Sequence, residues 1–115
     1  MNGVILLPDD WSSSYYSLSN TNQSGASYTS NTVTASQWST LEQHGVVFLP
    51  AAGDRDGASG SGISNVGSGG YYWSASYYIS SSAWYVLFCD TYLSTDLSYY
   101  RIFGLSVRLV APAEN

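Results

Sequence analysis

The sequence predicts an α+β domain built mostly of short antiparallel strands and long loops, with one clear helix. Only residues 34–45 combine a helix-start signal with a helix-stop signal, and several short apolar or aromatic runs have the length of strands. The 22 serines and 11 glycines fill the stretches between these runs. The 115 residues hold neither an internal repeat nor a linker, so we expect a single domain that spans 1–115.

The N-terminal part is predicted to contain two short strands separated by an irregular segment and the helix. Residues 4–7 are an apolar run that ends at Pro8, as a buried strand closing into a turn does. Residues 12–31 are rich in Ser, Asn and Thr and have no helical or alternating period, which predicts an irregular connection. Residues 46–49 form the second apolar run and the second predicted strand.

The helix is predicted over residues 34–45. Thr34 is a suitable N-cap, Gln37 three residues later completes a capping box, and Gly45 stands where a left-handed C-cap is needed. We expect the buried stripe of this helix to consist of Ala35, Trp38 and Leu41.

The C-terminal part is predicted to be an antiparallel sheet that follows a glycine-dense loop over residues 53–70. The predicted strands are residues 71–76, 83–88 and 105–110. In the last of them Leu105, Val107 and Leu109 are expected on one face. Residues 89–103 mix polar and aromatic types without a clean period.

Composition excludes several classes of partner. The net charge is −5, and the only basic residues besides His44 are three arginines, so the chain lacks the basic surface that nucleic acid or an anionic membrane requires. Its apolar runs are far shorter than the roughly 20 residues of a membrane span. A single cysteine, Cys89, excludes an internal disulfide.

No catalytic or metal motif stands out. None of the serines has glycine at both offsets of a nucleophile elbow, and His44 at the helix end is expected to cap the helix. One His and one Cys cannot supply a zinc site, and the glycine-dense loop has no lysine for phosphate. The run Asp54–Gly57 lacks the ligands of a calcium loop. We therefore expect no enzyme, metal or cofactor, although a glycosidase-type carboxylate pair is left open.

Aromatic residues are the remaining signal. Eight of the eleven tyrosines lie in the last 45 residues. Trp73 and Trp84 are interpreted as core residues of strands. Tyr92, Tyr99 and Tyr100 lie among Ser, Thr and Asp, and such a mixture of aromatic and small polar residues is typical of a binding surface.

Five runs of the sequence resemble the C-terminal half of the Fibrobacter succinogenes major paralogous domain family. They are Gly3-Val-Ile-Leu-Leu-Pro-Asp-Asp-Trp11, Gln37-Trp-Ser-Thr-Leu-Glu42, Val47-Phe-Leu-Pro-Ala-Ala-Gly53 with Arg55-Asp-Gly57, Gly70-Tyr-Tyr-Trp-Ser74 and Gly104-Leu-Ser-Val-Arg-Leu-Val110. These are bacterial proteins of C-type-lectin-like fold, related to the formylglycine-generating-enzyme scaffold. Some of them are similar to the variable proteins of diversity-generating retroelements of bacteria and phage.

The resemblance implies a diversified face between residues 85 and 103, a segment that contains no Lys, Glu, Gln, Met or Trp. The residues placed on that face are Tyr85, Leu87, Cys89, Asp90, Tyr92, Asp96, Leu97, Ser98, Tyr99, Tyr100, Ile102 and Phe103. The framework would comprise Trp38, Trp73, Trp84, Val86, Phe88, Arg101, Gly104 and Arg108. Strand alternation then directs Tyr85 and Leu87 outward and the residues between them inward.

The sequence also departs from the family. The calcium–sugar motifs of C-type lectins and the paired cysteines of the formylglycine-generating enzymes are absent, so neither activity carries over. Family members have a further N-terminal stretch that closes the fold. The chain is therefore a truncated or compact version, or a piece completed by a neighbour, and a homo-oligomer is left open.

The leading hypothesis is a non-enzymatic ligand-binding module of C-type-lectin-like fold that presents a Tyr-rich patch to a protein or glycan target. The family resemblance implies an extracellular or cell-surface location, with a phage particle as the alternative. The rival hypotheses are a structural or adhesive surface domain without an exchangeable ligand and, third, a hydrolase or oxidase on the same scaffold.

Overall fold

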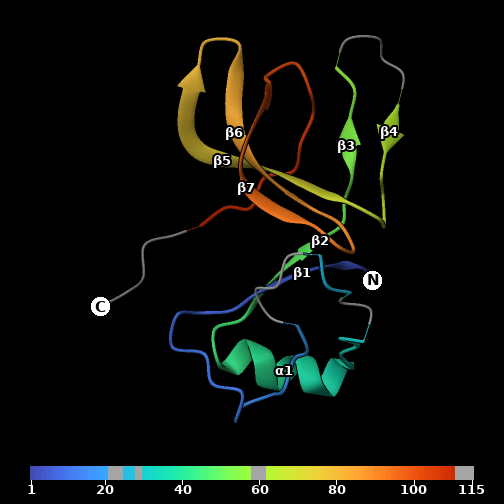
Figure 1. Cartoon of the computed structure of the whole chain (residues 1–115), viewed down its shortest axis with the longest axis vertical. Helices are drawn as coiled ribbons and strands as arrows, with labels where there is room; N and C mark the ends of the chain where they lie inside the picture. Colours follow the sequence, from blue (N-terminus) through green and yellow to red (C-terminus); the bar gives the residue numbers. More distant parts are fainter. Residues whose placement is uncertain (21–24, 28–29, 58–61, 111–115) are drawn as a thin grey trace.

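The structure is a computed structural model that describes residues 1–20, 25–27, 30–57 and 62–110. Its elements in chain order are β1 (Gly3–Leu6), α1 (Ala35–Gln43), β2 (Val47–Pro50), β3 (Asp54–Arg55), β4 (Ile63–Ser64), β5 (Gly70–Ile79), β6 (Ser82–Phe88) and β7 (Leu93–Tyr100). The paired strands are antiparallel. Figure 1 shows α1 at one end of the molecule and the β5–β6–β7 sheet at the other. The predicted combination of mostly antiparallel strands with one helix is confirmed for the described residues.

The start of α1 has the predicted capping box. The Thr34 hydroxyl oxygen accepts from the Gln37 backbone N–H at 3.3 Å, and the Gln37 side-chain oxygen accepts from the Thr34 N–H at 2.8 Å. Two N–H groups that the helix itself leaves unpaired are thereby satisfied.

The end of α1 is closed by Gly45, as predicted. Its φ of 80° is left-handed, its N–H donates to the Glu42 carbonyl at 3.0 Å, and the Val46 N–H donates to the Leu41 carbonyl at 3.2 Å. This pair of bonds is a Schellman motif. The prediction of a buried stripe is wrong at Ala35, which is exposed. The last turn of this short helix reaches the interior, where Leu41 is fully buried.

A two-stranded sheet, β1–β2, lies next to α1. Its register aligns Val4 with Leu49, and the Trp38 ring of α1 meets the Phe48 ring edge-on at a centroid distance of 5.8 Å. The described residues of the segment 12–31 form neither helix nor strand, as predicted. This segment is anchored where Tyr15 stacks on His44, with ring centroids 3.8 Å apart.

The second sheet has the strand order β5–β6–β7. The strand β7 was not predicted, because residues 89–103 lack an apolar alternation. Within β7 the polar Ser94 is buried while the apolar Leu93 is half exposed, and the pairing with β6 shifts register between Tyr85 and Leu87. A shift of this kind breaks the period-two pattern on which strand prediction depends.

The segment that follows β7 connects β3 with β5. Gly104 bridges to Arg55 of β3, and Ser106 bridges to Tyr72 of β5, so residues 104–106 run between β3 and β5. The predicted strand 105–110 is therefore wrong beyond Ser106. Residues 107–110 have no regular pairing, and Val107 and Leu109 are 63% and 87% exposed. Alternation alone cannot make a strand where no neighbouring strand pairs with it.

The segment predicted as a glycine-dense loop contains the short β3–β4 pair.

The core connects the β1–β2 sheet with the β5–β6–β7 sheet. Phe88 of β6 packs with Leu49, Ala51 and Tyr72, and the Tyr72 hydroxyl donates to the Pro50 carbonyl at 2.8 Å. A side chain on Gly70 would occupy the space of the Phe88 ring, so glycine is required at that position.

Among the described residues no helix is long and apolar enough to cross a bilayer.

The capping box generates a stability test. Replacing Thr34 with Ala should lower the free energy of unfolding by about 1 kcal/mol, because one N–H at the helix start loses its acceptor. The measurement is urea unfolding followed by circular dichroism. Thr40→Ala, at an exposed position inside the same helix, is the matched control and should change stability by less than about 0.5 kcal/mol. Equal losses in the two variants would contradict the capping role.

Candidate functional site

Five aromatic side chains form a continuous layer on one side of the β5–β6–β7 sheet. We call this layer the aromatic face, and its members are Tyr71, Trp73, Tyr85, Tyr99 and Phe103. Alternation along β5 places two of these residues on the same side, and the pairings Trp73↔Tyr85 and Ala83↔Tyr99 continue the layer across β6 to β7.

Tyr85 is the centre of the aromatic face. Its ring lies parallel to that of Tyr71 at a centroid distance of 6.3 Å, meets Trp73 edge-on at 6.3 Å and lies 5.5 Å from Tyr99. Phe103 extends the layer 4.3 Å beyond Tyr99. These separations are those of interacting rings, so the five side chains hold one another in place.

Burial differs between the centre and the rim of this layer. Tyr85 is 7% exposed, whereas the other four side chains are only half buried. The prediction that Tyr85 points outward is therefore wrong in its burial, because the rings of Tyr71 and Trp73 on β5 and of Tyr99 on β7 cover it. Its surrounding rings still present part of their area to water.

A polar group adjoins the aromatic face at Tyr71. The Asn65 side-chain amide donates to the Tyr71 hydroxyl at 3.1 Å and to the Asp54 carboxylate at 3.0 Å. Asn65 adopts a left-handed φ of 60° just after β4, and this turn brings its side chain back toward β5. The phenol of Tyr71 is thus fixed from the β3–β4 side.

The same surroundings raise the pKa of two phenols, those of Tyr71 and Tyr85. Burial is the largest cause that raises the pKa of Tyr71, and the nearby Asp54 carboxylate and the Tyr99 phenol add to it. Burial also raises the pKa of Tyr85, followed by the effects of Tyr71 and Tyr99. In both cases the environment disfavours the phenolate, so these two phenols keep their protons to higher pH than an ordinary tyrosine.

The twelve residues predicted for a single diversified face do not share one side of the sheet. Tyr85, Leu87, Leu97 and Tyr99 lie on the side of the aromatic face, and Phe103 joins them. Ser98 and Tyr100 pair with Trp84 and Ser82 and so face the opposite side, where Asp96 also lies beside Trp84. Cys89, Asp90, Tyr92 and Ile102 are exposed at the strand ends. The reason is that neighbouring residues from Leu97 to Tyr100 alternate between the two sides of the sheet, and the other positions lie beyond the strand ends.

Sequence reasoning missed the part of the aromatic face that β5 supplies. Tyr71 was not assigned to a binding surface and Trp73 was predicted to be a core residue, but both lie on the side opposite the buried Tyr72. The alternation within Gly70-Tyr-Tyr-Trp-Ser74 was the signal available, since it separates residue 72 from residues 71 and 73.

The residues predicted as framework lie at several places. Trp38 and Trp84 are half buried, the latter 4.5 Å from the Tyr78 ring, and Val86 borders the core cluster of Phe88. Arg101 and Arg108 are exposed, and Gly104 bridges to Arg55. His44 is the C-cap residue of α1, and its ring stacks on Tyr15.

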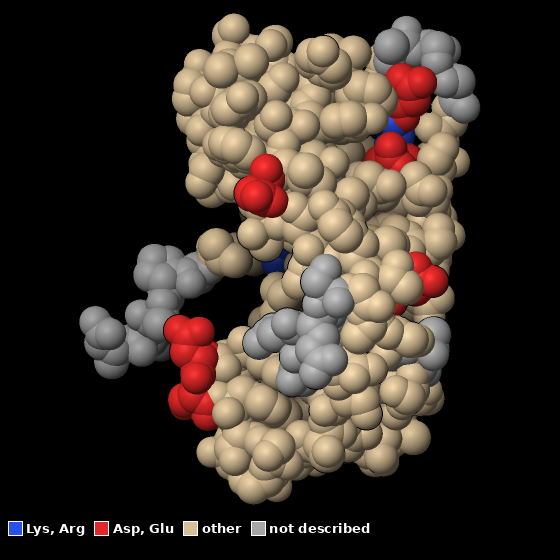
Figure 2. Space-filling model, in the orientation of Figure 1, with Lys and Arg blue, Asp and Glu red and all other residues tan. Residues whose placement is uncertain are grey.

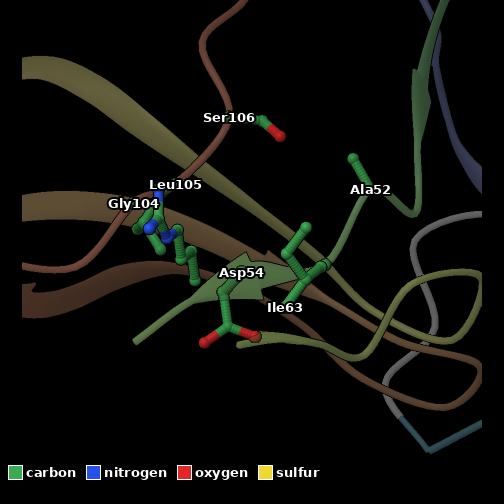
Figure 3. A pocket seen from close by; sticks show the side chains of 8 residues that line it. Ala52, Asp54, Ile63, Gly104, Leu105 and Ser106 are labelled. Carbon is green, nitrogen blue, oxygen red and sulfur yellow. The ribbon is translucent and has the colours of Figure 1, made fainter. Parts of the chain in front are cut away.

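Two shallow hollows accompany the β-sheet region. One, of about 230 Å³, is lined by Ala52, Gly53, Asp54, Arg55, Ile63, Gly104, Leu105 and Ser106. Figure 3 shows Ala52 and Ser106 on one side of it and the Asp54 carboxylate directed away from them. The other, of about 270 Å³, contains Asp96, whose carboxylate accepts from the Ser94 hydroxyl at 2.6 Å. Both are open, and in neither do two carboxylates face each other as glycoside hydrolysis would need.

Charge and metal ligands are sparse. Figure 2 shows that the face in view carries only scattered acidic and basic groups. Within the described part of the chain, no group of three or more His, Cys, Asp and Glu side chains could hold a metal ion.

Comparison with known proteins yields one match. The sequence model of a family described as a domain of unknown function (DUF8237) matches residues 11–110. No curated protein and no solved structure matches the chain.

The raised pKa of Tyr85 generates a prediction for alkaline solution. The unfolded chain ionises this phenol near the ordinary tyrosine pKa of 10.0, whereas the folded chain retains the proton to higher pH. The stabilisation is therefore complete below about pH 10 and is lost as pH rises through the folded pKa. Tyr85→Phe keeps the ring and removes the ionisation, so its free energy of unfolding should decline less steeply above that pH. Urea titrations at a series of pH values measure this, and parallel declines of the two proteins would refute the prediction.

Proposed function

The chain belongs to the DUF8237 family, and on its surface geometry we propose that it is a non-enzymatic recognition module that binds a protein or glycan through the aromatic face. The observation that carries this proposal is the partial exposure of Tyr71, Trp73, Tyr99 and Phe103 around a buried Tyr85. Large rings that contact one another and still meet water are more stable when a ligand covers them.

The chemistry of the aromatic face supports recognition. Tyrosine offers a rigid apolar ring with one polar tip and loses little conformational entropy on binding. The rings already contact one another at 4.3–6.3 Å, so a ligand would meet a pre-ordered surface. The Asp54–Asn65–Tyr71 hydrogen bonds add a polar edge that can fix the orientation of the ligand.

The finer assignment follows from the sequence resemblance. We propose a C-type-lectin-like scaffold of the kind used by variable proteins of diversity-generating retroelements, located outside the cell, at its surface or on a phage particle. The exposure of Cys89, Asp90, Tyr92 and Ile102 supports diversification, because an exposed side chain can change with little effect on the core.

A structural or adhesive role is the second candidate, and the exposed C-terminal segment favours it. Val107, Leu109 and Val110 are 63–89% exposed and could pack against a neighbouring domain. Sedimentation of the whole chain over a range of concentrations distinguishes the two candidates. An oligomer that persists at all concentrations and dissociates when Tyr99 and Phe103 are replaced with Ser would support the structural role.

Replacing Tyr99 and Phe103 together with Ser should weaken binding at least about tenfold, since one interface aromatic contributes ~2 kcal/mol or more. The measurement is retention of the purified chain on a printed glycan array and on a display library of folded domains and peptides. Tyr15→Ser is the control, because Tyr15 stacks on His44 at the end of α1, and Figure 1 shows α1 at the opposite end of the molecule from the β5–β6–β7 sheet. Unchanged binding in the double variant, with the fold intact by circular dichroism, would reject the proposal.

A further inference from the structure

One end of the β5–β6–β7 sheet carries exposed apolar side chains around a single arginine. Tyr77 and Ile79 belong to the end of β5, and their exposed fractions are 72% and 46%. Tyr100 and Ile102 follow at the end of β7, each 60% exposed. The register Ile79↔Ser82↔Tyr100 and the contacts of Arg101 bring these residues to the same end of the sheet, which we call the Arg101 corner.

The side chain of Arg101 is held in position although it is exposed. Its backbone N–H donates to the Ser81 carbonyl at 3.0 Å, and Nε and Nη2 both donate to the Ile79 carbonyl at 3.3 and 3.2 Å. The guanidinium carbon lies 5.5 Å from the centroid of the Tyr77 ring, a cation–π geometry.

This arrangement leaves N–H donors of the Arg101 guanidinium available to an acceptor. A guanidinium has five N–H donors in a fixed plane, and the bonds to Ile79 occupy two of them. Because the group is already ordered by Ile79 and Tyr77, an incoming acceptor would cost little further side-chain entropy.

Charge indicates what that acceptor is. The chain has three arginines, no lysine and a net charge of −5, so the Arg101 corner is a positive point on an acidic molecule. A polyphosphate or nucleic acid would require several cations together. A single planar guanidinium beside Tyr77 and Ile102 instead complements one carboxylate with an apolar neighbour, and Arg and Tyr are enriched among the residues that dominate protein interfaces.

We infer that the Arg101 corner docks a polypeptide partner, with a Glu or Asp carboxylate of the partner on the Arg101 guanidinium and an adjacent apolar side chain against Tyr77, Tyr100 and Ile102. This inference rests on the proposed recognition function and narrows its target to a polypeptide that presents a Glu or Asp next to an apolar side chain. It also identifies a contact that the aromatic face does not include, so the two can be tested separately.

The experiment uses a synthetic peptide array in which a glutamate stands next to Leu, Phe or Trp in varied sequence, printed beside the same peptides with glutamine. The whole purified chain is applied at low and high salt. The wild-type chain should retain a subset of glutamate peptides about tenfold more strongly than their glutamine counterparts, and less so at high salt. In Arg101→Gln the ratio should fall to about one, while Arg101→Lys should keep part of it.

Three further measurements decide the outcome. Ile102→Ser should weaken retention without altering the glutamate preference, and this variant does not disturb the bonds of Arg101 to Ile79. Tyr99→Ser with Phe103→Ser reports on the aromatic face alone. Circular dichroism verifies that each variant is folded.

Glutamate retention that survives Arg101→Gln, or no difference between glutamate and glutamine peptides, would overturn the inference. If peptide binding then depended on Tyr99 and Phe103, the proposed recognition function would stand without the inference about the Arg101 corner. A uronate- or sialate-bearing glycan array provides the remaining comparison. Retention there that requires Arg101, in the absence of peptide binding, would also overturn the polypeptide assignment.

Discussion

The packing of Phe88 over Gly70 is the contact on which the rest of the structure depends. The ring occupies the space that any side chain at position 70 would need, and it stacks near the Tyr72 ring at a centroid distance of 6.0 Å. Leu49 and Ala51 complete this cluster from the other sheet. This buried cluster joins β1–β2 to β5 and β6, which carry Tyr72 and Phe88, and β7 is positioned through its pairing with β6.

The central strand β6 has a different role on each of its sides. Val86 and Phe88 lie on the side of the core cluster, whereas Tyr85 and Leu87 lie on the side of the aromatic face. The strand that carries the central residue of the aromatic face, Tyr85, is therefore also anchored in the core by Phe88. A surface built on such a strand keeps its shape before any ligand arrives, which lowers the entropic cost of binding.

The two candidate contact regions differ in chemistry because they occupy different parts of this sheet. The aromatic face lies over the middle, where neighbouring strands cover Tyr85 and burial keeps its phenol neutral. The Arg101 corner lies at the strand ends, where the chain turns and backbone carbonyls such as that of Ile79 are available to a side chain. A charged group can be held there without the desolvation penalty of a buried site.

Prediction from sequence succeeded where the determining interactions are local. The capping box at Thr34, the left-handed Gly45, β1, β2 and β6 all depend on a few consecutive residues, and each was found close to its predicted bounds. The aromatic content of residues 85–103 was likewise visible, but its distribution over two sides of the sheet was not.

Only the tertiary structure decided which of these residues meet. Residues 105–110 alternate like a strand yet pair no further than Ser106, whereas residues 93–100 lack that pattern and form β7, because strand formation needs a partner edge in the right register. The proximity of Tyr71 to Tyr85 and of Arg101 to Tyr77 has the same origin. The sequence by itself determined the local elements and the stock of aromatic and polar groups; long-range pairing determined which of them share a surface.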